Sequence, residues 1–119
     1  MVLHIPHSST EIPREYLADY NLSLEDLSKE VQIMTDHFTD DLFDWPCDRA
    51  VFPVSRILVD AERFEQDYLE VMSKKGMGVL YEKTSDLKPL RPKLSYKRRE
   101  ELLEKYYRPH HKKLEMMVD

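Results

Sequence analysis

Glycine and cysteine are scarce in this chain, and each scarcity excludes a class of site. The only glycines are Gly76 and Gly78, too few for the glycine-rich loops that hold nucleotide phosphates, and the pair is typical of a turn. The only cysteine is Cys47, so neither an internal disulfide nor a zinc site built from cysteines can form. No serine nucleophile flanked by glycines occurs, which argues against a Ser/His/Asp hydrolase.

Long apolar runs are also missing. No segment is long and apolar enough to span a bilayer, and the first residues, MVLHIPHSS, have neither the basic start nor the apolar stretch of a secretory signal. We therefore expect a cytoplasmic protein with no membrane partner. Its 119 residues, 41% hydrophobic and 34% charged, predict one soluble globular domain over residues 1–119.

Basic charge is scarce in the first part of the chain. Residues 1–70 carry 16 acidic and 5 basic side chains, a net charge of −11, whereas residues 71–119 carry a net charge of +6. Opposite charges predict that the two parts attract each other. The basic stretch KPLRPKLSYKRR, residues 88–99, also suits phosphate binding, but the overall net charge of −5 favours a protein with no nucleic-acid partner.

Apolar spacing predicts both strands and helices. Short apolar runs predict strands at residues 1–5, 51–54, 57–59 and 77–81, the first ended by Pro6, which has no N–H to donate. Apolar residues at three- and four-residue intervals predict a helix over residues 24–43, and Ser23 with Asp26 fits a capping box at its start.

A last helix is predicted to begin after Ser95, with Pro109 bending it or starting a second segment. One face of this helix is expected to carry Leu103, Tyr107, His110, Leu114 and Met117. Strands interleaved with long helices indicate an α/β fold.

Three polar clusters stand out, and HIPHSST, residues 4–10, is the first. His7 follows the first predicted strand, and ligands of open α/β sheets bind at the carboxyl ends of strands. The hydroxyls of Ser8, Ser9 and Thr10 are suited to a substrate, or else to the loop's own backbone, as such residues commonly are.

The second cluster is TDHFTDD, residues 35–41. Asp36 and Asp40 are four residues apart, so on a helix their like charges repel. A metal ion would offset that repulsion, since zinc accepts carboxylate oxygen beside imidazole nitrogen. The alternative is a solvated acidic helix face.

The third cluster is SRILVDAERF, residues 55–64. In a strand, Arg56, Leu58 and Asp60 would point to one face. An arginine there suits a ligand that carries a carboxylate, with Asp60 orienting it. The alternative is a structural salt bridge from Asp60 to Arg56 or to Arg63.

Five stretches in order along nearly the whole chain carry a family resemblance: HIPHSSTEIP, TDHFTDDLF, FPVSRILVDAERF, GMGVLYEK with LR at 90–91, and YYRPHHKKL. Together they resemble the N-formylglutamate amidohydrolase family. The resemblance implies a mixed β-sheet flanked by helices, as in zinc carboxypeptidases and aspartoacylase. It also implies zinc-dependent hydrolysis of the N-formyl or N-acyl amide of an acidic amino acid, in histidine degradation.

The resemblance also implies roles for single residues. It makes His7 and Asp36 metal ligands, with Glu11 as the runner-up carboxylate. It makes His111 catalytic, and it assigns substrate binding to Arg56, Arg63, Arg91, Ser8 and Ser9. Glu62 stands where the family pattern has asparagine, so a negative charge replaces a neutral amide beside the arginines.

A third metal ligand is not assigned by these motifs. In the family that this chain resembles, the third ligand looks to be a histidine in an Asp-x-His-Ser motif on a later strand. Full members of the family are longer than this chain. We therefore expect the N-terminal part of such a domain, with an incomplete site, pairing with the absent half or with a second copy. The alternative function is a carboxylate-binding or interaction module that lacks the metal.

Overall fold

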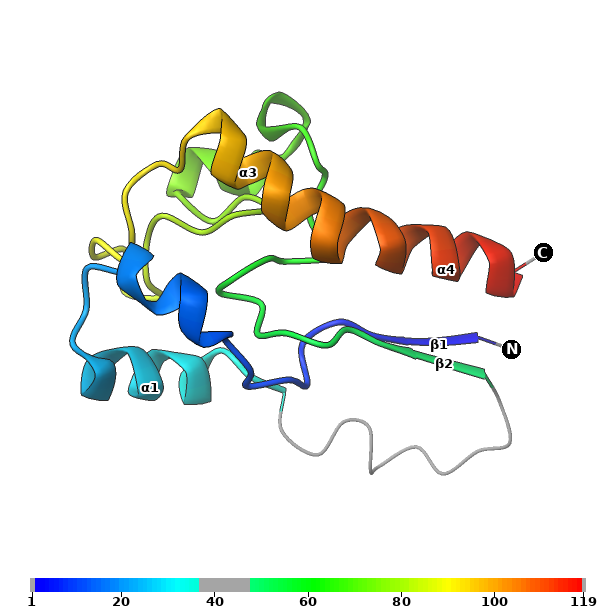
Figure 1. Cartoon of the computed structure of the whole chain (residues 1–119), viewed down its shortest axis with the longest axis horizontal. Coiled ribbons are helices and arrows are strands. Elements are labelled where there is room, and N and C mark those ends of the chain that lie inside the picture. Colours follow the sequence, from blue (N-terminus) through cyan, green and yellow to red (C-terminus); the bar gives the residue numbers. More distant parts are fainter. Residues whose placement is uncertain (1, 37–47, 119) are drawn as a thin grey trace.

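The computed structural model describes residues 2–36 and 48–118, and it contains both helices and strands (Figure 1). Strands β1 (Val2–Ile5) and β2 (Asp48–Val51) run parallel, with Val2 opposite Asp48 and Ile5 opposite Val51. They form the one sheet found among the described residues. The α/β class and the first predicted strand are confirmed.

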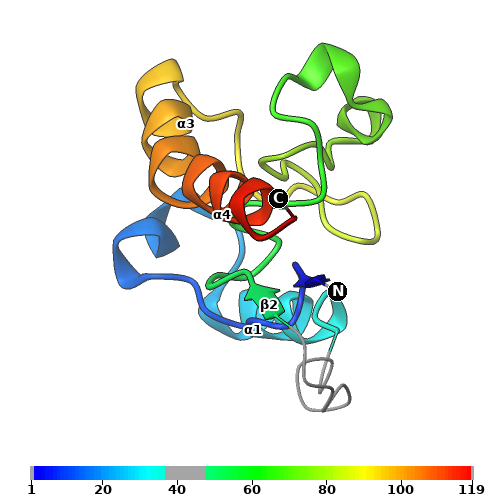
Figure 2. The same ribbon diagram turned by 90° about the vertical axis from the view of Figure 1, so that its right-hand side faces the viewer.

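Helix α4 (Arg108–Val118) lies along this sheet, as two views at right angles show (Figures 1 and 2). His110 of α4 is buried there. The centroid of its ring lies 4.9 Å from that of His4 in β1, in a tilted contact, and 4.9 Å from that of Phe52, which follows β2, in an edge-to-face contact. The packing fixes the carboxyl ends of both strands against the helix.

Helix α1 (Leu24–Ile33) begins as predicted and ends earlier. The hydroxyl of Ser23 accepts a hydrogen bond from the Asp26 N–H at 3.1 Å, which confirms the N-cap. The prediction was wrong for residues 34–36, because the Asp36 N–H donates to the carbonyl of His7 at 2.8 Å instead of continuing the helix. The remainder of the predicted helix, residues 37–43 with Asp40, lies outside the described residues.

The last helical region also begins as predicted, since the Ser95 hydroxyl accepts from the Arg98 N–H at 3.2 Å. Helix α3 (Tyr96–Leu102) leads through a π-helical segment, Leu103–Tyr107, into α4. The wide turn directly precedes Pro109, whose ring cannot fit behind a normal helical turn. The two segments predicted around this proline are therefore present.

The predicted strands at 51–54, 57–59 and 77–81 are wrong, except that β2 includes Val51. Pro53 cannot extend the ladder, and the Leu58 N–H donates to the Ser55 carbonyl at 3.0 Å, which closes a turn. Residues 57–59 are completely buried, so they are apolar because the core surrounds them. The prediction that Arg56, Leu58 and Asp60 point to one face of a strand is therefore also wrong, because this segment forms a turn.

Opposite charges join the two parts of the chain, as predicted. Arg98 pairs with Asp19 at 3.2 Å, Lys105 with Glu15 at 2.9 Å, and Arg99 with Asp67 at 3.4 Å. Exposed pairs of this kind contribute little to stability, so they orient the last helical region more than they stabilise it.

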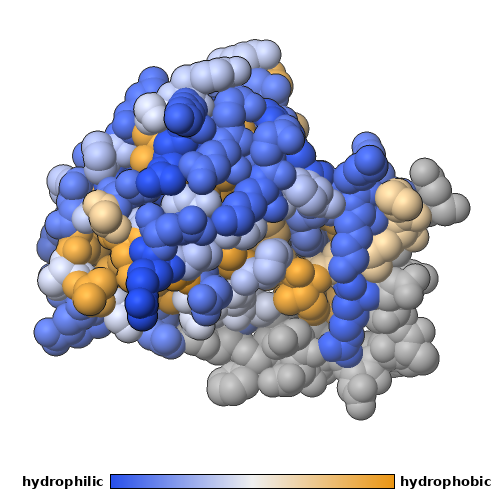
Figure 3. Space-filling view, in the orientation of Figure 1, coloured by the Kyte–Doolittle hydropathy of each residue, from blue (hydrophilic) through white to orange (hydrophobic). Residues whose placement is uncertain are grey.

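The surface in the view of Figure 3 is mostly hydrophilic, with apolar side chains gathered toward the α1 end. Among the described residues, no helix has the length and apolarity needed to cross a bilayer. Gly76 has a φ of 74°, which confirms the expected turn there.

Candidate active site

Asp60 is the centre of the polar cluster that follows β1. Its carboxylate is completely buried. The Oδ1 atom lies 2.7 Å from Nε2 of His7 and accepts a hydrogen bond from the Glu62 N–H at 3.0 Å. One buried carboxylate thus holds the imidazole of the HIPHSST loop.

The other carboxylate oxygen, Oδ2 of Asp60, is surrounded by donors. Arg56 Nη2 and Arg63 Nε each lie 3.5 Å away, and the hydroxyl of Tyr81 donates to the same oxygen. The Tyr81 hydroxyl also accepts from Arg56 Nε at 3.0 Å. Both salt bridges that the sequence offered as the structural alternative are present.

Short backbone contacts bring these segments together. Pro6 releases the chain from β1, while the Phe52 N–H still donates to the carbonyl of Ile5 at 2.9 Å. Further on, the Ser55 N–H donates to the Glu11 carbonyl at 2.7 Å. The HIPHSST loop therefore runs beside residues 52–55, whose turn carries Arg56 and Asp60 toward His7.

The cluster shifts the acidity of its members. Burial alone would raise the pKa of Asp60, but the hydrogen bond and electrostatic interaction with His7, the hydroxyl of Tyr81 and the Glu62 N–H lower it to about 2. Burial, together with the neighbouring Asp60 carboxylate, raises the pKa of Tyr81. Asp60 is thus an anion, and Tyr81 a neutral donor, at all ordinary pH values.

The second ring nitrogen of His7 faces two carboxylates. Nδ1 lies 3.8 Å from Oδ2 of Asp36 and 3.9 Å from Oε2 of Glu62. Metal-binding histidines commonly place one nitrogen on the metal while the other donates to a carboxylate, as Nε2 is placed to do with Asp60. Imidazole nitrogen with carboxylate oxygen suits a divalent cation. Even so, no three His, Cys, Asp or Glu side chains within residues 2–36 and 48–118 converge closely enough to hold one.

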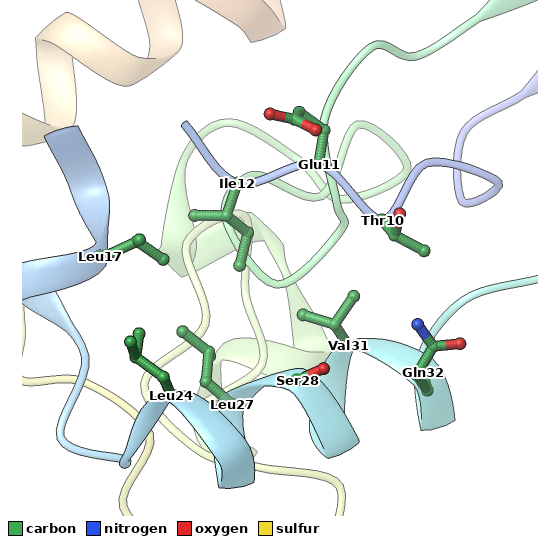
Figure 4. A pocket seen from close by; sticks show the side chains of 9 residues that line it. All are labelled: Thr10, Glu11, Ile12, Leu17, Leu24, Leu27, Ser28, Val31 and Gln32. Atoms are coloured by element: carbon green, nitrogen blue, oxygen red, sulfur yellow. The ribbon is translucent and has the colours of Figure 1, made fainter. Parts of the chain in front are cut away.

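Glu11 and the loop serines lie apart from this arrangement. The hydroxyl of Ser9 donates to the Pro53 carbonyl at 2.9 Å and accepts from the Glu11 N–H at 3.1 Å, so it satisfies backbone groups. Ser8 is half-buried. The exposed Glu11 side chain points away from α1 at the rim of a groove of about 300 Å³ between that helix and residues 10–12 (Figure 4). Within the described structure, its carboxylate forms no ion pair with His7, whose carboxylate neighbours are Asp36, Asp60 and Glu62.

Arg91 has a different setting from Arg56 and Arg63. It is 2% exposed and donates to the carbonyls of Tyr81 and Leu58, both at 2.8 Å, and to the Tyr20 hydroxyl at 3.1 Å. Leu58 and Tyr81 belong to the segments that carry the Asp60 cluster. Arg91 therefore holds the backbone of Leu58 and Tyr81, which belong to the segments that carry the Asp60 cluster.

His111 lies beside the cluster. Its Nε2 donates to the carbonyl of Ala61 at 2.7 Å, and its ring centroid is 4.3 Å from that of Tyr107. Ala61 stands between Asp60 and Glu62, so His111 lies beside the backbone that carries both carboxylates. The neighbouring His110 shares a hydrogen bond with His4 instead, with 2.9 Å between their Nε2 atoms.

A model of the N-formylglutamate amidohydrolase family matches residues 1–119, the whole chain. The chain belongs to this family. No significant match was found among curated proteins or among solved structures. Membership supports a hydrolase activity of the amidohydrolase type, and it agrees with the resemblance carried by the five motifs.

In this amidohydrolase-family chain, the sequence did not single out Tyr81. It lies in an apolar run that predicts a strand, and no feature of that run indicates a tyrosine bound to a buried carboxylate. Glu62 was noticed only for its charge, and the structure adds its position facing His7. Both belong to the site because of contacts distant in sequence.

In the basic stretch of residues 88–99 the arginines are engaged in contacts within the chain, whereas Lys88, Lys93 and Lys97 are exposed. Arg91 is buried, Arg98 pairs with Asp19 and Glu101, and Arg99 binds the carbonyl of Glu65 as well as Asp67. Its arginines serve internal contacts.

Proposed function

We propose that this family member hydrolyses the amide bond of an N-formyl or N-acyl amino acid with the aid of a divalent metal ion, zinc being the expected one. One observation carries the proposal: His7 is held at Nε2 by the buried Asp60 and turns Nδ1 toward Asp36 and Glu62. That is how a protein presents an imidazole to a metal.

The residues that would hold the ion are His7, through Nδ1, and Asp36, through its carboxylate. A bound divalent ion supplies Lewis acidity to the acyl carbonyl and to a water molecule. Glu62 is better placed than Glu11 to assist, because its carboxylate faces the same ring nitrogen.

The remaining residues act by binding and orientation. Arg56 and Arg63 form a cationic wall that suits a substrate carboxylate, and Asp60 with Tyr81 fixes the direction of both guanidinium groups. His111 lies beside the cluster with its Nε2 committed to the Ala61 carbonyl. We therefore assign to its Nδ1 the transfer of a proton to the leaving amine.

The fold proposal is finer than the α/β class. We infer a zinc carboxypeptidase-like sheet, of which β1 and β2 would be adjacent parallel strands. Its support is the position of His7 directly beyond the carboxyl end of β1, where open α/β sheets bind their ligands.

The test uses the full chain after chelation and reloading with zinc. Metal content is measured by mass spectrometry, and hydrolysis of N-formyl and N-acetyl amino acids by the appearance of free amine. We expect Asp36→Asn to lower zinc affinity by at least about tenfold. The matched control is Asp86→Asn, a change of the same type at an exposed loop aspartate. Zinc affinity unchanged by Asp36→Asn contradicts the metal assignment.

A carboxylate-binding module without a metal is the second candidate. The observation in its favour is that no three metal-ligating side chains converge among the residues described. It predicts that N-acyl amino acids bind equally well with and without zinc and are not hydrolysed. The amidohydrolase proposal predicts turnover that chelation abolishes and zinc restores.

A further inference from the structure

We infer that the substrate of this site carries a single carboxylate, and that Glu62 excludes N-acyl amino acids with an acidic side chain. The inference rests on the proposed function and specifies its substrate class as N-acyl amino acids with a neutral or cationic side chain.

The first support is the charge that the opening presents to solvent. The carboxylates of Asp36 and Glu62 both approach Nδ1 of His7, and their side chains are 60% and 50% exposed. The cationic side chains of Arg56 and Arg63 are more deeply buried, being only 17% and 18% exposed. A ligand entering toward His7 therefore meets two negative groups first.

The second support is the number of carboxylates that the arginines can neutralise. Two guanidinium groups share the buried Asp60, which leaves a net charge of +1 in that trio. Tyr81 adds no charge, because its pKa is raised and it stays neutral. The excess matches one carboxylate, such as the α-carboxylate that every N-acyl amino acid carries.

The donors that remain agree with one carboxylate. Arg56 uses Nε on the Tyr81 hydroxyl and Nη2 on Asp60. Arg63 uses Nε on Asp60 and on the carbonyl of Met77, at 3.1 Å, while its two Nη nitrogens donate no hydrogen bond within the described structure. A pair of nitrogens on one planar group binds one carboxylate in a two-pronged fashion.

A divalent ion does not reverse this balance. Two positive charges at His7 would be matched by the carboxylates of Asp36 and Glu62, so the opening would become neutral. Among residues 2–36 and 48–118, a second substrate carboxylate would find no uncompensated cation in this trio and would lie close to Glu62. Repulsion between like charges in such a partly buried site strongly disfavours binding.

The test compares N-formylglutamate with N-formylglutamine, which have nearly the same shape and differ in one charge. Binding to the zinc-loaded full chain is measured by calorimetry, and turnover by release of amine. We expect wild type to bind the glutamine compound at least about tenfold more tightly. Glu62→Gln is expected to reduce the difference to less than about threefold, by improving the binding of N-formylglutamate.

The matched control is Glu25→Gln on α1, which changes the net charge equally at a side chain that is 81% exposed. It should leave the preference for N-formylglutamine as in wild type.

Equal or tighter wild-type binding of N-formylglutamate overturns the inference, and so does failure of both compounds to bind. If a Glu62 variant does not fold, the wild-type comparison still decides. If the chain prefers N-formylglutamine in binding but hydrolyses neither compound, the result supports selection by charge and contradicts the proposed hydrolysis. If the chain hydrolyses N-formylglutamate in preference to N-formylglutamine, the result supports the hydrolysis and contradicts selection by charge.

Discussion

The imidazole of His7 and the carboxylate of Asp60 are joined through a 2.7 Å contact between Nε2 and Oδ1, although 53 residues separate them in the chain. Both side chains are buried. Because the same carboxylate also receives Arg56, Arg63 and Tyr81, a single anion orients the imidazole and the guanidinium groups together. The metal-binding and carboxylate-binding parts of the proposed site are therefore coupled by Asp60.

Replacing Asp60 by asparagine tests this coupling. The amide keeps the shape but removes the charge, which leaves two partly buried guanidinium groups without their anion. We expect a loss of about 3 to 5 kcal/mol in the free energy of unfolding, measured by urea denaturation at neutral pH. The exposed control Asp86→Asn should change it by less than about 0.5 kcal/mol. A loss for Asp60→Asn as small as that of the control contradicts the role of Asp60 as the central anion.

The same carboxylate predicts an acid limb in stability. Its pKa is lowered from the usual value of 3.8 to about 2 in the folded protein. The unfolded chain therefore takes up the proton first, so the stabilisation is complete above about pH 4 and is lost as pH falls toward 2. Denaturation midpoints measured between pH 5 and 2 should show this loss in wild type, and a flatter profile in Asp60→Asn.

His110 predicts a separate loss of stability at higher pH. Burial, assisted by the electrostatic effect of His4, His111 and Lys113, lowers its pKa to about 4, and burial also lowers the pKa of His4. The unfolded state binds more protons between pH 6.5 and 4, so stability falls as pH decreases through that range and levels off below it.

Replacement of His110 by phenylalanine should flatten this limb, because the edge-to-face ring contact with Phe52 remains while the titrating group is lost. Thermal unfolding midpoints at pH 7, 6, 5 and 4 provide the measurement. A profile as steep as that of wild type would show that another group is responsible. The control Lys113→Gln keeps both histidines and should retain most of the slope.

Local patterns predicted the helix starts and the end of β1 beside His7, because their causes lie within a few residues. Ser23 and Ser95 each cap a helix through a contact three positions away, and Pro6 ends β1 next to His7. The wrong strands have a non-local cause. Residues 57–59 and 77–81 are apolar because the core encloses them, and a short buried run has the same composition in a strand or in a turn.

The sequence predicted which residues belong to the candidate site better than it predicted the contacts between them. His7, Arg56 and Arg63 could be named from motifs, whereas the contacts that tie them to Asp60 and Tyr81 depend on the tertiary fold. Arg91 shows the limit most plainly, since a basic residue in a basic stretch favours a surface position, yet its guanidinium is enclosed by carbonyls.

Arg91 should be among the most costly residues to replace. In Arg91→Lys one point charge cannot reach the Tyr81 carbonyl, the Leu58 carbonyl and the Tyr20 hydroxyl together, so buried acceptors lose their donor. Each unsatisfied group costs about 1 to 3 kcal/mol, and we expect a total loss of at least about 2 kcal/mol by urea denaturation. The exposed Arg14→Lys should be nearly neutral. Equal stability of the two variants would show that Arg91 does not stabilise the segments of Leu58 and Tyr81.

Tyr81→Phe separates orientation of the site from its stability. The change removes the hydroxyl that donates to Asp60 and accepts from Arg56 Nε, while the ring keeps its place in the core. Loss of that hydrogen bond should cost about 1 to 2 kcal/mol in unfolding free energy and should raise the pKa of Asp60, because the hydroxyl helps to lower it. The acid limb of the stability profile would then begin at a lower stability and be shallower.

Since Arg56 would lose one of its two fixed contacts, KM for an N-acyl amino acid should rise more than kcat falls. Tyr107→Phe is the matched control, because its hydroxyl donates to the Arg63 carbonyl at 2.6 Å and not to Asp60. A Tyr81 variant with the wild-type acid limb and unchanged KM would show that Asp60 and Arg56 keep their positions without the phenol.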